Sequence, residues 1–211
     1  MSPRSGASAD DGTRSKDRIL QAAGQLAKER GIHGATIAAV SQRSGLPASS
    51  IYWHFSDKDA LFAEVVRTSF AQWLATVPQW TAPDAATLHE GLQSILSVSS
   101  RTLRDVPDFL RIGMQVLLDH RDEHSTTRQA FLGIRSQTAA MITAYLRQAL
   151  GPDTDRTLTE DLATLVITFS EGLLVGSQVY ADWDPEEYLE VFLGMFDHAV
   201  STESRPASRA G

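Results

Sequence analysis

The stretch that decides the fold runs from Gly34 to Leu61 and reads GATIAAVSQRSGLPASSIYWHFSDKDAL. Within it, Thr36 can cap a short helix that ends near Gly45. Pro47 suits the first turn of a second short helix, because a proline there loses no helical hydrogen bond. Two short helices joined by a tight turn containing glycine predict a helix-turn-helix when longer helices flank them.

Apolar residues at helical spacing continue on both sides of this stretch. Before it, an apolar stripe ends ahead of Gly31, which stands where a helix C-cap belongs, and comprises Ile19, Ala22, Ala23, Leu26 and Ala27. After it, residues 56–59 read as a capping box for a long helix lined by Leu61, Phe62, Val65, Val66, Phe70 and Trp73. We expect the shared core to include Ile37, Val40, Ile51, Phe55 and Leu61.

The helical pattern persists to about residue 200, without an alternating strand pattern or an internal repeat. Glycines, prolines and capping residues divide this part into five further helices. We expect the first of them to end at about Asp105, the second to cover Asp108–Leu118 and the third to end at Gly151. The fourth should begin with a capping box formed by Thr157 and Glu160, and the fifth should begin at Asp184. The sequence thus predicts an all-α protein of about nine helices.

Composition narrows the function classes. Of the 211 residues, 42% are hydrophobic and 21% are charged, which is typical of a globular protein. The chain has no cysteine, which excludes disulfides, a thiol nucleophile and cysteine-based zinc sites. Because no apolar run is long enough to span a bilayer and the N-terminus lacks the apolar segment of a secretory signal, we expect a cytoplasmic protein without membrane contact.

Charge is distributed unevenly along the chain. The net charge is −7, yet residues 14–58 carry seven basic and three acidic side chains, a local net charge of +4 that leaves −11 for the rest. A basic segment attached to an acidic body suits a module that meets phosphate with one end only.

The ordered series from Gly34 to Leu61 resembles the DNA-binding signature of the TetR family. Two positions depart from that signature, since Pro47 replaces the commoner serine and Ser49 replaces a frequent glycine. The resemblance implies a homodimeric repressor that binds double-stranded operator DNA and is released by a small apolar or amphipathic effector. We therefore expect a disordered arm over 1–12, a DNA-binding domain over 13–73 with its helix-turn-helix at 36–55, a ligand-binding and dimerisation domain over 74–200 and a disordered tail over 201–211.

The predicted DNA contacts divide into phosphate and base contacts. Thr36 at a helix N-terminus, Tyr52 with its terminal hydroxyl and Lys58 in a first helical turn suit backbone phosphate. The alternatives are a half-buried core aromatic for Tyr52 and a solvated surface charge for Lys58. Base edges are expected to meet side chains on or beside the second short helix, namely Gln42, Arg43, Ser49, Ser50, Trp53 and His54. No Arg, Asn or Gln lies between residues 46 and 55, so the bidentate readers of guanine and adenine are missing there.

The C-terminal part supplies candidates for an effector pocket and for a dimer interface. The pocket candidates, most of which also suit an ordinary core, are Trp80, Phe109, Met114, Met141, Tyr145, Phe169 and Glu171. Glu171 is a carboxylate within an apolar stretch, so we expect it to face the ligand or to pair with an arginine such as Arg135 or Arg147. The last two helices offer apolar faces for a dimer bundle, with intramolecular burial as the alternative, at Leu173, Gly176, Tyr188, Phe192, Met195 and Phe196.

Two other interpretations stay open. His120, Glu123 and His124 match the H-x-x-E-H pattern of metallopeptidases. Because this match falls in a charged connector without a third ligand, we predict no functional metal, no other cofactor and no enzymatic activity. The second alternative is a DNA-binding dimer that responds to a protein partner and needs no ligand cavity.

Overall fold

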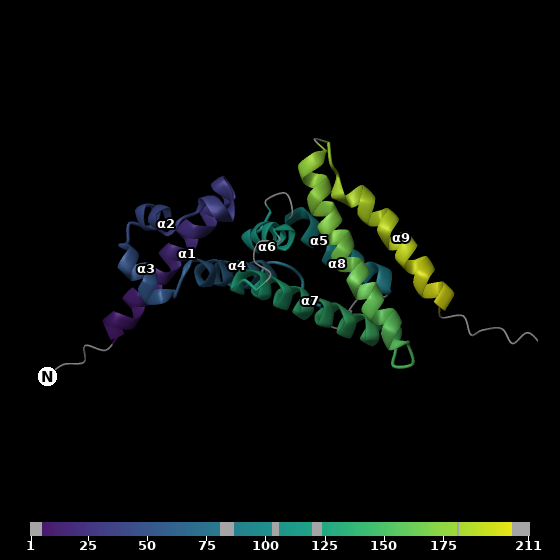
Figure 1. Cartoon of the computed structure of the whole chain (residues 1–211). Coiled ribbons are helices and arrows are strands. Elements are labelled where there is room, and N and C mark those ends of the chain that lie inside the picture. Colours follow the sequence, from purple (N-terminus) through teal and green to yellow (C-terminus); the bar gives the residue numbers. More distant parts are fainter. Residues whose placement is uncertain (1–5, 81–86, 103–105, 120–123, 181, 204–211) are drawn as a thin grey trace, which may run out of the picture. The chain divides into compact units, whose positions relative to one another are not determined.

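Helices make up nearly all of the described chain. The computed structural model describes residues 6–80, 87–102, 106–119, 124–180 and 182–203, and within these ranges it has nine helices and no strand (Figure 1). The helices are α1 (Gly6–Gly34), α2 (Ile37–Ser44), α3 (Ala48–His54), α4 (Lys58–Leu74), α5 (Leu88–Thr102), α6 (Asp108–Leu118), α7 (Thr126–Leu150), α8 (Arg156–Val179) and α9 (Pro185–Glu203). The prediction of an all-α protein is confirmed.

The helices gather into two compact units. The first contains the residues up to Trp73 together with Pro107–Ile134, and the second contains Leu74–Val106 together with the residues from Arg135 onward. The long helix α7 therefore begins in the first unit and ends in the second.

This division differs from the predicted one, which placed all of residues 74–200 in a single C-terminal domain. Residues 107–134 pack with the N-terminal residues because α6 presents Phe109 to the end of α4. The ring of Phe109 lies 5.3 Å from that of Phe70 and 5.4 Å from that of Trp73, measured between centroids. Sequence periodicity identifies an apolar helix face but not the helix on which it packs.

The core of the first unit includes the apolar residues of the helix-turn-helix. The residues expected in this core are buried at Val40, Ile51, Phe55 and Leu61, whereas Ile37 is only half-buried. Gly113 allows α6 to approach α7 closely, since a Cβ at this position would clash with the ring of Phe131.

The core of the second unit is built by α5, α7, α8 and α9. Its buried side chains are Leu92, Ile95, Leu96, Ile142, Tyr145, Leu146, Leu162, Ala163, Val166, Leu189, Phe192, Leu193 and Phe196. Gly176 lets the ring of Trp183 lie against α8, because a Cβ there would clash with the indole. Side chains from four helices thus close one hydrophobic core.

The chain ends are more helical than expected. Within the arm predicted to be disordered, α1 already begins at Gly6, and α9 continues through Glu203. Ala7 and Ala9 have the highest helix propensity of any residue type, and extending an existing helix is easier than nucleating a new one. Residues 1–5 and 204–211 lie outside the described residues.

Two helices are capped one or two residues away from the predicted cap. Asp57 caps α4 by accepting a hydrogen bond from the Ala60 amide at 2.7 Å, and Asp155 caps α8 by accepting one from the Thr157 amide at 2.9 Å. The expected capping boxes at residues 56–59 and at Thr157 and Glu160 are therefore wrong in detail. Pro47 precedes the first turn of α3 instead of lying in it.

Helix α8 is long and apolar enough to cross a membrane, judged by its length and composition alone. Core helices of globular proteins pass the same test. Leu162, Ala163 and Val166 of α8 are buried against the other helices of the second unit, which is the arrangement of a core helix.

Candidate nucleic-acid interface

The helix-turn-helix is held by short polar contacts at its turn. The Thr36 hydroxyl accepts a hydrogen bond from the Ala39 amide at 3.2 Å and so caps α2. Gly45 follows α2 with a positive φ of 66°, a conformation that favours glycine. The Ser41 hydroxyl donates to the Leu46 carbonyl at 2.7 Å and closes the turn ahead of α3.

Helix α3 separates a buried face from an exposed face. Ile51 is buried completely, whereas Trp53 is 78% exposed and Tyr52 is 56% exposed. Ser49 is exposed and Ser50 is half-buried. The structure thus brings the predicted base-contacting residues of α3 to one surface, and the alternative of a half-buried Tyr52 is wrong.

His54 lies at the end of this surface. Its imidazole meets the Trp53 indole edge-on, with 4.6 Å between the ring centroids. Partial burial and the nearby positive charge of Lys16 lower the pKa of His54 from its ordinary 6.5. His54 is therefore expected to be neutral at pH 7 in the free protein.

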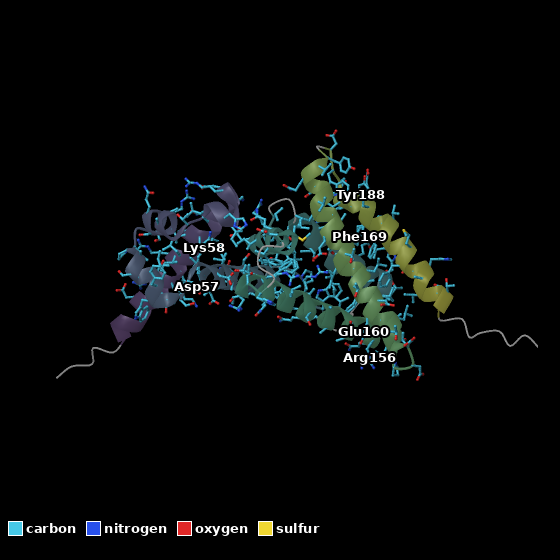
Figure 2. The ribbon with its side chains drawn as sticks, viewed as in Figure 1. Asp57, Lys58, Arg156, Glu160, Phe169 and Tyr188 are labelled. Carbon is cyan, nitrogen blue, oxygen red and sulfur yellow. The ribbon has the colours of Figure 1, made fainter. Side chains whose placement is uncertain are left out.

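Lys58 lies at the start of α4 and is half-buried (Figure 2). Its ammonium donates a hydrogen bond to the His33 carbonyl at 3.3 Å, near the end of α1, and lies 5.8 Å from the centre of the Phe62 ring. Burial lowers the pKa of Lys58. Lys58 is therefore not the solvated surface charge of the alternative interpretation.

Arg43 and Gln42 occupy the outer face of α2. Both nitrogens at the end of Arg43 donate to the carboxylate of Glu29, at 2.5 and 2.8 Å. This pairing raises the pKa of Arg43 and lowers that of Glu29. Arg43 must release Glu29, or share it, before it can contact DNA. Gln42 is exposed.

A depression beside α3 includes residues that the sequence reasoning missed. It has a volume of about 390 Å³ and is lined by Asp11, Gly12, Ser15, Ser49, Ser50, Trp53 and His54. The first three residues belong to α1. No sequence signal pointed to them, because their place beside α3 depends on how α1 packs.

The predicted effector residues fall into both units. Phe109 and Met114 belong to the first unit, whereas Trp80, Met141, Tyr145, Phe169 and Glu171 belong to the second. The structure therefore does not bring the predicted pocket residues together as one set. Phe109 is a core residue beside Phe70, and Met114 is half-buried.

Within the second unit, Tyr145 is the most distinctive of these candidates. It is 2% exposed, and its hydroxyl has no hydrogen-bond partner among the described residues. Burial raises its pKa. Trp80 meets its ring edge-on at 5.5 Å. Glu171 forms an ion pair with Arg135, so of the two arginines proposed as its partner Arg135 is the one that binds it.

The predicted dimer residues divide between core and surface. Leu173, Gly176, Phe192 and Phe196 are buried inside the second unit, so the intramolecular alternative is correct for these four. The ring of Phe192 stacks on that of Phe169 with 4.0 Å between centroids. Tyr188 and Met195 are exposed on α9, and Figure 2 labels Tyr188 there.

The H-x-x-E-H match lies mostly outside the described residues. His120 and Glu123 are not described, and His124 is exposed. Among the described residues no group of three or more metal-binding side chains comes together.

Known proteins resemble this chain most clearly over the helix-turn-helix. Residues 19–65 match the model of bacterial regulatory proteins of the tetR family. The HTH-type transcriptional repressor AcnR of Corynebacterium efficiens is 32% identical over 73 residues, which are 35% of this chain and 39% of AcnR. A TetR-type regulator from Streptomyces avermitilis superimposes with a TM-score of 0.68 at 21% identity, covering 89% of this chain and 98% of that one.

The N-terminal part of the chain, residues 19–65, is similar to the DNA-binding segment of the tetR family. The match to AcnR spans less than two fifths of the length of that relative. Outside the residues matched by the tetR model and by AcnR, the chain resembles these known proteins in fold alone. The regulator FadR from Bacillus subtilis, solved in complex with stearoyl-CoA, has a TM-score of 0.64 at 15% identity, covering 88% of this chain and 97% of FadR.

Proposed function

We propose that the chain is a cytoplasmic transcriptional repressor that binds a palindromic operator as a homodimer. The observation that carries this proposal is the exposed face of α3, where Ser49, Tyr52 and Trp53 stand clear of a buried Ile51. An exposed indole beside serine hydroxyls on a short helix suits insertion into the major groove. The flanking Lys58 supplies a cation for backbone phosphate.

Dimerisation is supported by two exposed apolar stripes in the second unit. On α8 the stripe follows helical spacing through Leu165, Val175 and Val179, and on α9 it follows Tyr188, Val191 and Met195. Gly172 and Gly194 face open space near these stripes, so another helix could approach closely. Exposed apolar stripes on adjacent helices are typical of helical dimer interfaces. They replace the buried residues first predicted for this role.

The effector is proposed to bind in the second unit. The supporting observation is the buried Tyr145 hydroxyl, because a buried polar group without a partner is costly and a ligand acceptor would relieve that cost. The stearoyl-CoA complex of FadR shows a ligand with a long apolar chain in a protein of this fold. A small apolar or amphipathic effector with a hydrogen-bond acceptor therefore fits best.

One experiment tests the DNA-binding proposal directly. The purified 211-residue chain is used to select binders from a random duplex library at fixed salt concentration. An enriched palindrome whose half-sites lie about one helical turn apart, roughly 34–36 Å, is the expected result. Enrichment of no sequence over random DNA would refute a sequence-specific repressor.

A second experiment separates a small-molecule effector from a protein partner. Acyl-CoA thioesters and free fatty acids are added during thermal unfolding and operator binding. A compound that raises the melting temperature and weakens operator binding supports the effector, since binding only the native state stabilises it. If no compound does either, while a protein partner releases the operator, the partner alternative is correct.

A further inference from the structure

The depression beside α3 joins the N-terminal part of α1 to the exposed face of α3. Its lining consists of Asp11, Gly12 and Ser15 from α1 and of Ser49, Ser50, Trp53 and His54 from α3. Three of these residues, Ser49, Ser50 and Trp53, are the proposed base readers. A base edge that reaches them therefore also reaches the residues that α1 supplies. Figure 1 shows the N-terminal part of α1 beside α3.

Asp11 and Ser15 lie four residues apart on α1, so both side chains occupy the same face of the helix. Gly12 leaves open space beside them, since a Cβ at that position would meet no atom within 4 Å. The depression thus combines room, three serine hydroxyls and one carboxylate, and its lining contains no lysine or arginine.

This combination selects against the DNA backbone. A phosphate placed in the depression would face the Asp11 carboxylate, while the nearby Lys16 is paired with Glu64 at 2.6 Å and the lining itself has no lysine or arginine. A base edge that carries an amino group is the complementary occupant, because a carboxylate only accepts hydrogen bonds.

We propose that Asp11 reads a cytosine of the operator half-site through its N4 amino group. The four major-groove edges differ in what they offer a carboxylate. Guanine presents two acceptors and thymine one, and both repel it. Adenine has an amino group but also the N7 acceptor beside it. Cytosine alone presents a donor without a neighbouring acceptor.

The proposal also supplies what α3 lacks. Residues 46–55 contain no Arg, Asn or Gln, so no side chain of α3 can grip guanine with two hydrogen bonds. A G·C pair can still be recognised through its cytosine. Asp11 would then be a specificity-determining residue that belongs to α1 instead of α3.

The inference rests on the proposed operator binding, and the same selection experiment tests it. Random duplexes are selected with the wild-type protein and with Asp11→Ala, Asp11→Asn and Asp17→Asn. Asp17 is the matched control, because it is an exposed carboxylate on α1 that does not line the depression. Removing either negative charge is expected to strengthen binding to all duplexes slightly.

Only the Asp11 variants are expected to change the selected sequence. With Asp11→Ala, one G·C position in each half-site should lose its preference by about five- to tenfold. With Asp11→Asn, the preference at that position should move toward adenine, because an amide can both donate and accept. The spacing of the half-sites should stay as in the wild type.

Two results overturn the inference in distinguishable ways. If the wild type selects a palindrome and both Asp11 variants select the same one, Asp11 reads no base and the proposed function survives. If the wild type selects no sequence, the proposed function fails together with the inference. Equal thermal unfolding of Asp11→Asn and wild type ensures that folding is not the cause.

Discussion

Lys58 and Trp53 are the residues at which contacts to the DNA backbone can be distinguished from contacts to the bases. Lys58 is expected to contact a phosphate, so Lys58→Ala should weaken operator and scrambled duplex by similar factors. It should also reduce the slope of log K against log salt by about one. Trp53→Ala should weaken mainly the operator, at the low end of roughly 1–3 kcal/mol, with the salt slope nearly unchanged.

The measurement is the binding of each variant to both duplexes over a series of salt concentrations. Thermal unfolding serves as the control, because Lys58 also donates to the His33 carbonyl. If Lys58→Ala alters sequence preference while Trp53→Ala weakens both duplexes equally, the orientation proposed for α3 on DNA is wrong.

Removal of the Tyr145 hydroxyl tests the effector proposal. Tyr145→Phe removes a buried hydroxyl that has no partner among the described residues. The free energy of unfolding should stay the same or rise by up to about 1 kcal/mol, because an unsatisfied group is lost. Release of the operator by the effector should weaken. Chemical unfolding measures the first effect, and a clear loss of stability would show that the hydroxyl is bonded in the native state.

Single residues also show what sequence can and cannot predict about the candidate site. Thr36 and Gly45 were predictable, because a cap and a positive φ are local properties of the chain. The pairing of Arg43 with Glu29 and the position of Asp11 beside α3 were not predictable. Both depend on how α1 packs, and no local pattern specifies that packing.

At the scale of elements, Asp59 joins α4 to α7. Its carboxylate accepts hydrogen bonds from the amides of Thr126 and Thr127 and from the Thr127 hydroxyl, the last at 2.6 Å. Asp59→Ala should therefore leave the Thr126 and Thr127 amides at the start of α7 without this acceptor and lower the free energy of unfolding by about 1–2 kcal/mol. Chemical unfolding checks this against Asp153→Ala, an exposed carboxylate that should change little.

The contribution of Asp59 also depends on pH. Burial alone would raise its pKa, but the hydrogen bonds from Thr127 and Thr126 outweigh burial and hold the pKa below the ordinary 3.8. The unfolded chain then binds the proton more readily than the folded one. The stabilisation is complete above about pH 4 and is lost as the pH falls from the ordinary value through the lowered one. The difference between wild type and Asp59→Ala should shrink accordingly.

Element boundaries were predictable where glycine or proline ends a helix, and less so where a side chain caps one. Helix α6 runs over Asp108–Leu118 as expected, and α7 ends before Gly151. The caps of α4 and α8 differ because several acidic and hydroxyl side chains stand together at each start. Tertiary partners decide between them, as Asp59 shows by binding Thr127 instead of its own helix.

At the scale of the whole molecule, the exposed stripes of α8 and α9 test dimerisation. Met195 is 68% exposed, so Met195→Glu should leave the fold intact. Combined with Val191→Glu, it should both split the dimer and abolish tight operator binding, since two half-sites require two DNA-binding domains. Sedimentation and operator binding measure the two effects on the same samples.

Phe192→Glu is the informative contrast. Phe192 stacks on Phe169 inside the second unit, so a charge there should lower the melting temperature and disrupt folding. A dimer that survives the double change at Val191 and Met195, with unchanged operator binding, would show that dimerisation uses another surface.

The division into units was the part of the molecule least accessible from sequence. Helical periodicity predicts nine apolar faces without saying which pairs of faces meet. The assignment of α6 and the start of α7 to the first unit depends on contacts such as those of Phe109 with Phe70 and of Phe131 with Gly113. Each pair is formed by residues that a sequence pattern treats as equivalent apolar positions.

The amides of Thr126 and Thr127 give this molecule a built-in spectroscopic reporter. Both donate to one carboxylate, so their proton resonances should be displaced downfield and should titrate with Asp59. Helix α7 begins at these amides in the first unit and continues into the second. Their hydrogen exchange would therefore report, without any attached label, whether a ligand bound to the second unit changes the stability of the start of α7.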